Sequence, residues 1–413
     1  METPVNYYSR KQFIKLSAGA ALVALVRYDD VIAGGGSGRP PLNPREREAY
    51  TLHLLDKLCT AIGPRPTGST AYEIGAQIIR EELQKSLSSV AYDYYHFNKW
   101  ELISEARFEI DHQLIETYLA FGSQGTPEGG VSGVLIPSES GFAVVHTHTQ
   151  KIEAYLAVNK YGRAIPTDRS LADPTEPPFF GIGKQDVVSL EKAVINQSLV
   201  RLKAPVRFST NGKGINVIGQ LPGKQKDEIL FLAHADTMYS TPGAIDNTAS
   251  VIVMIMLAHE AAKRGIHKHT LTFAATDGEE YGLLGAKNYA RIRIKEDTMK
   301  NIRYIINFDS LTWGPNLWIN SLNDEVKDIL RSVHHDLGIK SYPRFESSDG
   351  FSMDSAPFRP SEGRALHVNS RGYDEQTLPL YHRPDDQTAN VPLDCVESAF
   401  QLFNEFIQRI DKL

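Results

Sequence analysis

Cysteine is scarce in this sequence, which has only Cys59 and Cys395 among its 413 residues. Two cysteines exclude both a cysteine-rich zinc site and a disulfide framework. Both lie in predicted helices near the two ends of the folded chain, where they either pair or remain as buried thiols. The 13 histidines and 50 acidic residues leave sites for hard and borderline metals open.

The sequence also lacks an excess of positive charge and a long apolar run. Its formal net charge of −6 gives no basic footprint for nucleic acid, so no nucleic acid partner is expected. The apolar run at residues 16–26 is too short to span a bilayer, and no stable membrane insertion is expected. With 41% hydrophobic residues, the chain can bury a large core and is expected to hold more than one domain.

The first 43 residues are typical of an export signal followed by a flexible lead. Residues 9–15, SRKQFIK, resemble a twin-arginine signal in which Lys11 occupies the second arginine position. The short apolar run follows, Ala33 ends a candidate cleavage site, and residues 34–38 are glycine-rich. An exported, periplasmic or extracellular protein is therefore expected. The alternative is an amphiphilic N-terminal helix of a cytoplasmic protein or an uncleaved anchor.

The centre of the chain predicts an α/β fold. Residues 229–233 and 271–275 are short apolar runs flanked by polar residues, as in buried strands of a largely parallel sheet. Residues 248–262 lie between them and are apolar on one side, which predicts a helix. The expected architecture is a mostly parallel mixed sheet flanked by helices.

A change in texture predicts an inserted domain. Between residues 112 and 206, glycine and proline separate short strand-like runs, and no cluster of catalytic residue types occurs. We call residues 112–206 the insert and expect it to be mostly β. The catalytic domain would then comprise residues 44–111 and 207–413.

Polar residues gather where the predicted strands of the catalytic domain end. The carboxyl ends of strands in an open α/β sheet are the usual place for ligands. The residues found there and in the adjoining loops are His234, Asp236, Asp246, Glu279, Glu280, Asp309 and His382.

These residue types suit a site for two metal ions. A hydrolase with two adjacent cations needs an open position on each and a shared water of lowered pKa. An anionic ligand between the cations reduces their repulsion, and Asp246 fits this position. If Asp246 is shared, His234, Glu280, Asp309 and His382 complete three protein ligands for each metal. Glu279 is then free to act as the base.

Five motifs, in this order, resemble the co-catalytic zinc exopeptidases, which include bacterial zinc aminopeptidases and glutamate carboxypeptidases. The similarity extends from about residue 216 to the C-terminus, and residues 62–69 resemble the lead-in region of the same family. The insert resembles, by position and texture, the protease-associated domain of some members. The motifs are His234-Ala235-Asp236, Gly243-Ala244-Ile245-Asp246-Asn247, Asp277-Gly278-Glu279-Glu280-Tyr281-Gly282, Asn307-Phe308-Asp309 and Tyr381-His382.

The resemblance implies two Zn²⁺ ions and a role for each residue. His234 and Asp309 would hold one zinc, Glu280 and His382 the other, and Asp246 would bridge them. A hydroxide between the metals would attack terminal peptide bonds of peptide substrates.

Three residues beside the ligands also receive roles from the resemblance. Glu279 would deprotonate the water. The Asp236 carboxylate would accept the second N–H of the His234 imidazole, and Tyr381 would donate to the oxyanion. The family often has a cis peptide after the bridging aspartate, so the Asp246–Asn247 bond is a candidate.

Several alternatives stay open. The aspartates also suit helix caps or turns, and Glu279-Glu280 also suits a solvated first helical turn. Aminopeptidase activity is favoured over carboxypeptidase activity. Arg344, Arg359 and Arg371 suit the binding of a substrate carboxylate, but surface roles are favoured for them. A glutaminyl cyclase with one zinc and a receptor-like protein without zinc share the expected fold. Asp349 and Asp354 are interpreted as loop residues.

Overall fold

The computed structural model of this chain describes residues 43–160, 162–167, 176–341, 343–347, 353–361, 365–371 and 380–413. The expected export segment lies outside these residues, except for Asn43, which caps the first described helix. None of the helices in the described part of the chain is long and apolar enough to cross a membrane.

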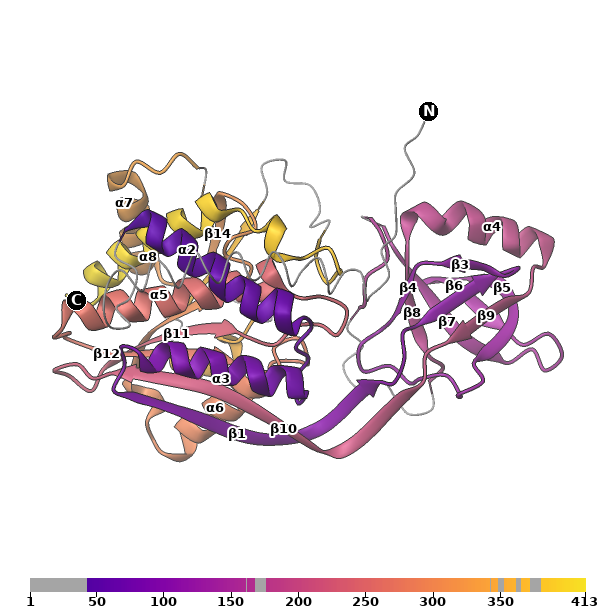
Figure 1. Ribbon diagram of the computed structural model, residues 1–413, viewed down its shortest axis with the longest axis horizontal. Coiled ribbons are helices and arrows are strands. Elements are labelled where there is room, and N and C mark those ends of the chain that lie inside the picture. Colours follow the sequence, from indigo (N-terminus) through magenta and orange to yellow (C-terminus); the bar gives the residue numbers. More distant parts are fainter. Residues whose placement is uncertain are drawn as a thin grey trace.

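The structure has two lobes, each built on a sheet of eight strands (Figure 1). In the first sheet the strand order is β1-β10-β12-β11-β13-β16-β14-β15. Strands β12, β11, β13 and β16 run parallel at its centre, whereas β10 pairs antiparallel with both β1 and β12, and β14 pairs antiparallel with β16 and parallel with β15. The predicted mostly parallel mixed sheet is therefore confirmed. Its strands are β1 (Ser89–Leu102), β10 (Val206–Leu221), β11 (Glu228–His234), β12 (Thr270–Thr276), β13 (Ile302–Phe308), β14 (Asn316–Asn320), β15 (Arg344–Glu346) and β16 (Ala365–Arg371).

Helices cover both faces of the first sheet (Figure 1). Alternation along β11 explains this, because Phe231 and its same-face neighbours join one apolar cluster while Leu230 and Leu232 join another. The first cluster packs against α5 and α8, and the second packs against α6. The helices are α2 (Pro44–Leu55), continued by a π-helical turn (Asp56–Ile62), α3 (Thr70–Gln84), α5 (Ala249–Arg264), α6 (Leu284–Lys295), α7 (Asp324–Asp336) and α8 (Leu393–Ile410).

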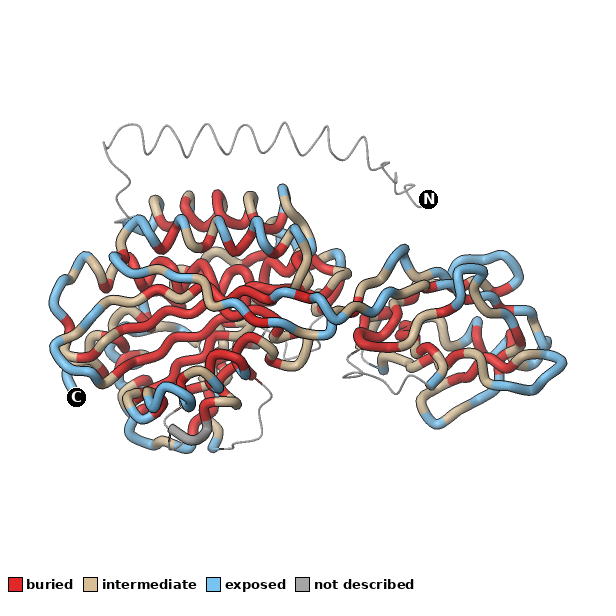
Figure 2. Tube along the Cα trace, turned by 90° about the horizontal axis from the view of Figure 1, so that it is seen from below, coloured by how far each residue is buried: buried red, intermediate tan, exposed pale blue. Residues whose placement is uncertain are grey.

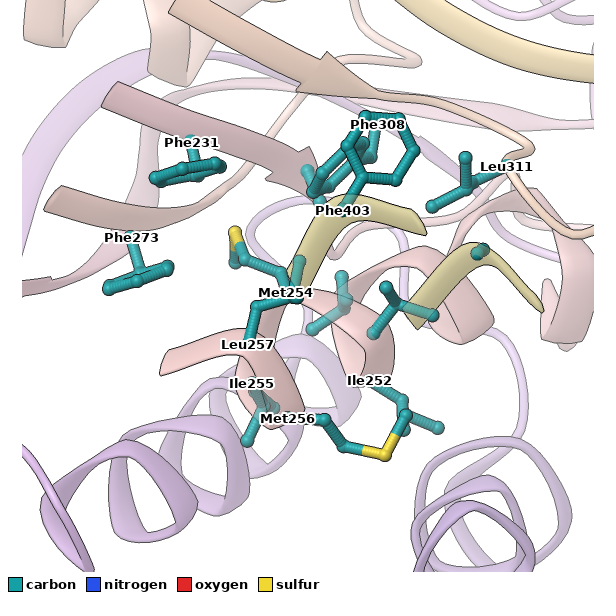
Figure 3. Packing of buried hydrophobic residues seen from close by; sticks show 14 of the residues in the cluster. Phe231, Ile252, Met254, Ile255, Met256, Leu257, Phe273, Phe308, Leu311 and Phe403 are labelled. Carbon is teal, nitrogen blue, oxygen red and sulfur yellow. The ribbon is translucent and has the colours of Figure 1, made fainter. Parts of the chain in front are cut away.

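Aromatic rings and sulfur-containing side chains fill the core beneath α5. Figure 3 shows Phe231 beside Phe273, with Met254 of α5 opposite them. The rings of Phe231 and Phe273 stack with centroids 5.0 Å apart, and Phe308 meets Phe403 of α8 edge-on at 4.7 Å. This packing fixes the ends of β11, β12 and β13, from which the candidate site is built.

The second sheet forms the other lobe. Its strand order is β3-β2-β9-β5-β6-β7-β8-β4. The strands are β2 (Arg107–Ile110), β3 (Gln113–Ile115), β4 (Thr117–Leu119), β5 (Val131–Ser138), β6 (Gly141–Val145), β7 (Ile152–Asn159), β8 (Phe179–Gly183) and β9 (Val200–Lys203), and α4 (Val187–Asn196) packs against β5. Strand β2 precedes residue 112, where we placed the start of the insert, and those boundaries stay a prediction.

Two long strands join the lobes. β1 and β10 pair from Ser89↔Gln220 at one end to Leu102↔Val206 at the other, and they run from the first sheet to the second (Figure 1). Each lobe has its own buried interior, drawn in red in Figure 2. Cys59 and Cys395 are buried free thiols, so of the two alternatives for the cysteines the unpaired one is found.

Candidate metal centre

Three parallel strands end at the candidate site. His234 is the last residue of β11, and Asp309 follows β13. Glu279 and Glu280 lie in the loop after β12. Asp246 lies in the turn between β11 and α5, and His382 lies in the loop before α8. The topology therefore brings together side chains from five separate segments, as expected from the strand order.

The predicted ligands form two groups that share one residue. His234, Asp246 and Asp309 offer one set of ligand atoms within 4.8 Å of one another, and Asp246, Glu280 and His382 offer a second. In the first, Nε2 of His234 lies 3.3 Å from Asp246 Oδ1 and 3.8 Å from Asp309 Oδ1. In the second, Nε2 of His382 lies 3.0 Å from Glu280 Oε2 and 3.7 Å from Asp246 Oδ2. The two oxygens of Asp246 thus face different groups.

Backbone and side-chain contacts hold the shared ligand in place. Asn247 donates to the Phe308 carbonyl at 2.9 Å and accepts the Ser310 N–H at 3.0 Å, which ties the Asp246 turn to the end of β13. Two N–H groups of the turn, those of Ile245 and Asp246, donate to the Asp386 carboxylate. The Asp246–Asn247 peptide bond is cis, as the resemblance predicted.

Asp236 makes two hydrogen bonds that were not predicted. Its carboxylate accepts the backbone N–H groups of Glu279 at 3.1 Å and of Glu280 at 3.3 Å. The imidazole of His234 instead places Nδ1 3.1 Å from the Asp236 carbonyl oxygen, while the nearer carboxylate oxygen lies 3.6 Å away. The carboxylate is turned toward the loop after β12, and its role as acceptor of this N–H stays a prediction. Asp236 nonetheless contacts both a ligand and the proposed base.

Burial and like charge dominate the electrostatics of the site. Burial raises the pKa of Glu279 well above its ordinary value; His234 opposes this rise, and the charges of Asp309 and Glu280 add to it. Burial alone would lower the pKa of His234, but the carboxylates of Asp236, Asp246 and Asp309 raise it well above the usual range.

The donor set fits metal ions. Several carboxylates share a small buried volume, and charges of one sign are stable there only when cations balance them. Oε1 of Glu280 is buried without a hydrogen-bond partner among the described residues, although its other oxygen meets His382. Two imidazoles and three carboxylates, with no thiolate, match the ligands that zinc takes in catalytic sites.

Tyr381 lies directly beside the predicted ligand His382. Its ring stacks on the imidazole of His382, with centroids 3.6 Å apart. Burial raises the pKa of its hydroxyl well above the ordinary value, and the charges of Glu280 and Asp246 raise it further, so the hydroxyl keeps its proton and can donate. Its role stays a prediction.

Sequence reasoning missed two buried carboxylates near the site. Asp354, interpreted above as a loop residue, is only 1% exposed, and Thr276 donates a short hydrogen bond to its carboxylate. Burial raises the pKa of Asp354 to about 7. Asp386 is also 1% exposed. The sequence around Asp386, HRPDD, has no periodicity that marks either aspartate as buried.

The arginines considered as binders of a substrate carboxylate do not gather at the site. Arg344 lies in β15, is 64% exposed in its side chain and pairs with Glu346. Asp349 and the side chains of Arg359 and Arg371 lie outside the described part of the chain. No described arginine supports the carboxypeptidase alternative.

A cleft of about 950 Å³ opens between the two lobes, beside the loops that carry the ligands. Its walls include Tyr239, Ser240, Tyr281 and Pro384 from those loops and Tyr118 from the insert. None of the five predicted metal ligands lines this cleft.

Comparison with known proteins agrees with the family resemblance of the first lobe. Residues 216–407 match the family model described as Peptidase family M28. The chain is 24% identical over 392 residues to aminopeptidase YwaD of Bacillus subtilis (strain 168), an alignment that covers 87% of this chain and 83% of that protein.

Solved structures match over both lobes. A Peptidase M28 precursor from Shewanella amazonensis SB2B matches with a TM-score of 0.74 at 16% identity, covering 88% of this chain and 93% of that one. BSAP, a zinc aminopeptidase from Bacillus subtilis, matches with a TM-score of 0.69 at 21% identity, covering 88% and 95%. At these identities the structures establish the fold.

Proposed function

We infer that this chain is a zinc-dependent exopeptidase of peptidase family M28 that hydrolyses terminal peptide bonds, with aminopeptidase activity favoured. The observation that carries this conclusion is the pair of ligand groups that share Asp246, with Glu279 beside them. Relatives are named aminopeptidases, and the shared fold extends over both lobes.

Five residues would hold the metal. His234 and Asp309 would bind one zinc, Glu280 and His382 a second, and Asp246 would contact both, so two ions per chain are proposed. When bound, zinc ions polarise a carbonyl and supply a water of lowered pKa as the nucleophile.

Glu279 moves the protons in this proposal. Its carboxylate would accept a proton from the attacking water and pass it to the leaving amine. The Asp236 carboxylate fixes the backbone N–H of Glu279 and so orients the base. Tyr381 would donate to the carbonyl oxygen as negative charge develops on it.

Aminopeptidase activity is favoured over carboxypeptidase activity because the relatives are named aminopeptidases. Export of the protein, expected from residues outside the described ones, is proposed as well.

The test combines metal analysis with blocked substrates. Protein purified without chelator should contain about two zinc ions per chain and cleave aminoacyl p-nitroanilides, and 1,10-phenanthroline should abolish the cleavage. N-acetylation of the same anilides should prevent hydrolysis. Hydrolysis of N-acetyl dipeptides in place of free amines would indicate a carboxypeptidase. One zinc with cyclisation of N-terminal glutamine would indicate a cyclase, and absence of zinc would contradict the proposal.

A further inference from the structure

The three loops that carry His234, Glu280 and His382 all contact the other lobe. The apolar core of the second lobe contains Met238, and Tyr239 and Tyr281 pack against it, although all three residues belong to the first lobe by sequence. Tyr239 follows His234 in the same loop, and Tyr281 is adjacent to Glu280. The second lobe is therefore packed directly on the chain segments that present the ligands.

Specific hydrogen bonds accompany the packing of two of these loops. The hydroxyl of Tyr239 donates to the carbonyl of Leu119 in β4 at 2.6 Å. The ring of Tyr281 packs on Phe121 with centroids 3.5 Å apart, and its hydroxyl donates to the Trp100 carbonyl at 3.3 Å. A tyrosine hydroxyl with a defined acceptor fixes both the ring and the loop that bears it.

The third loop is bound through Arg383, which follows the ligand His382. Arg383 is only 2% exposed. Its guanidinium donates to the Ala164 carbonyl at 2.6 Å and to the Glu116 carboxylate at 2.9 Å, and both acceptors belong to the insert. It also donates to Asp385 at 3.2 Å within its own loop. A buried guanidinium with a planar set of acceptors has little freedom to move.

His382 needs such support because of its backbone conformation. Its φ is 55°, in the left-handed region that is uncommon for residues other than glycine. A residue held there costs on the order of 1–3 kcal/mol and persists only when surrounding contacts impose it. The carbonyl of His382 accepts a hydrogen bond from the Ser240 hydroxyl at 2.8 Å, within its own lobe. The next residue, Arg383, is held by acceptors of the insert, so both lobes contribute to fixing this backbone.

We propose that the insert completes the metal centre, and that Glu116 acts through Arg383 as a positioning residue that sets His382 for metal binding. The inference rests on the proposed function, since it assigns the insert a part in holding the same zinc. In this arrangement the insert is a fixed support of the site, not a lid that moves freely over it.

Glu116→Ala tests the proposal without disturbing a ligand. The Glu116 side chain is 26% exposed, so its truncation does not open the core. The zinc affinity should fall by about 10- to 100-fold in competition with a chromogenic chelator, the range typical of losing a group that orients a ligand. Glu116→Gln retains an acceptor without the charge, and its affinity should lie between those of Glu116→Ala and the wild type.

Arg163→Ala is the matched control. Arg163 also contacts Glu116, at 3.0 Å, and Asp385, at 3.4 Å. Its side chain is 58% exposed, whereas that of Arg383 is 3% exposed. This variant should bind zinc as the wild type does. The thermal midpoint of chelated Glu116→Ala should match that of chelated Arg163→Ala, which separates ligand positioning from general stability.

The outcomes divide clearly. If the wild type binds zinc and Glu116→Ala binds it with the same affinity, this inference is wrong but the proposed function stands. The same holds if Arg163→Ala loses as much zinc affinity as Glu116→Ala. A wild-type protein that binds no zinc would overturn the proposed function, and the inference with it.

Discussion

The carboxylate of Asp386 accepts the backbone N–H of Asp246 at 3.1 Å, so the loop that carries His382 also fixes the turn that carries the shared ligand. The second oxygen of Asp386 accepts the N–H of Ile245 at 2.8 Å. Burial raises the pKa of Asp386 to about 7, although these two hydrogen bonds favour the charged form. One buried side chain therefore couples two parts of the metal centre that are far apart in sequence.

Replacing this side chain should weaken both folding and metal binding. Asp386→Ala leaves two buried N–H groups without an acceptor, which should lower the free energy of unfolding of the zinc-free protein by at least about 2 kcal/mol. Zinc affinity should fall about 10-fold or more, because the shared ligand loses its support. Chemical denaturation and chelator competition measure the two effects. Gln387→Ala, an exposed change in the same loop, should alter neither, and an unchanged Asp386→Ala protein would contradict the coupling.

Glu279→Gln should separate the base from the ligands. The amide keeps the shape of the side chain but cannot accept the proton, so kcat should fall by about 10²- to 10⁴-fold while the zinc content stays that of the wild type. Elemental analysis and steady-state kinetics on the same sample provide the test. Loss of zinc from this variant would make Glu279 a ligand. Asp246→Asn is the contrasting change, and it should release zinc because the shared ligand loses its charge.

Much of this site follows from the sequence because strand ends are predictable. The apolar runs that became β11 and β12 place His234 and Glu280 at one edge of the sheet, and the parallel order of the strands then brings them together. Helix α8 (Leu393–Ile410) has an apolar face that repeats regularly along the chain, which is the pattern that predicts a helix.

Side-chain direction and contacts between lobes could not be predicted in this way. The carboxylate of Asp236 accepts two N–H groups of the loop after β12, which its predicted role beside His234 did not include. Asp354 and Asp386 are buried by loops whose path depends on tertiary packing and not on periodicity. The acceptors of Arg383 come from the insert, more than two hundred positions away in the sequence. Residue order carries no signal for such contacts.

His259 should make stability depend on pH. It is buried in α5, where Nδ1 lies 2.6 Å from Ser86 Oγ and Nε2 lies 3.2 Å from the Tyr50 hydroxyl. Burial lowers its pKa from 6.5 to about 4. Between these values the unfolded chain binds a proton that the folded protein does not, so stability present above pH 6.5 is lost as the pH falls toward 4, by roughly 3 kcal/mol in total.

Urea denaturation of the zinc-free protein between pH 7.5 and 4.5 measures this dependence, because zinc binding has a pH dependence of its own. His259→Gln should reduce the loss of stability toward acid relative to the wild type. His335→Gln, at a side chain that is 89% exposed, should keep the wild-type profile. Identical profiles for His259→Gln and the wild type would show that this histidine does not cause the acid loss.

The buried pair of Arg293 and Glu228 should govern stability without affecting catalysis. Arg293 in α6 donates to Glu228, the first residue of β11, through both terminal nitrogens. The side chains are 9% and 5% exposed, and Glu228 lies at the opposite end of β11 from His234.

Arg293→Met leaves the carboxylate buried without its partner, which should cost about 3–5 kcal/mol of unfolding free energy. The variant Glu228→Leu/Arg293→Met removes both charges and should recover most of that loss, because two apolar side chains of similar size replace the pair. Both proteins should keep wild-type kcat per folded molecule. A double variant as unstable as Arg293→Met would show that the loss in Arg293→Met does not come from the unpaired Glu228 carboxylate.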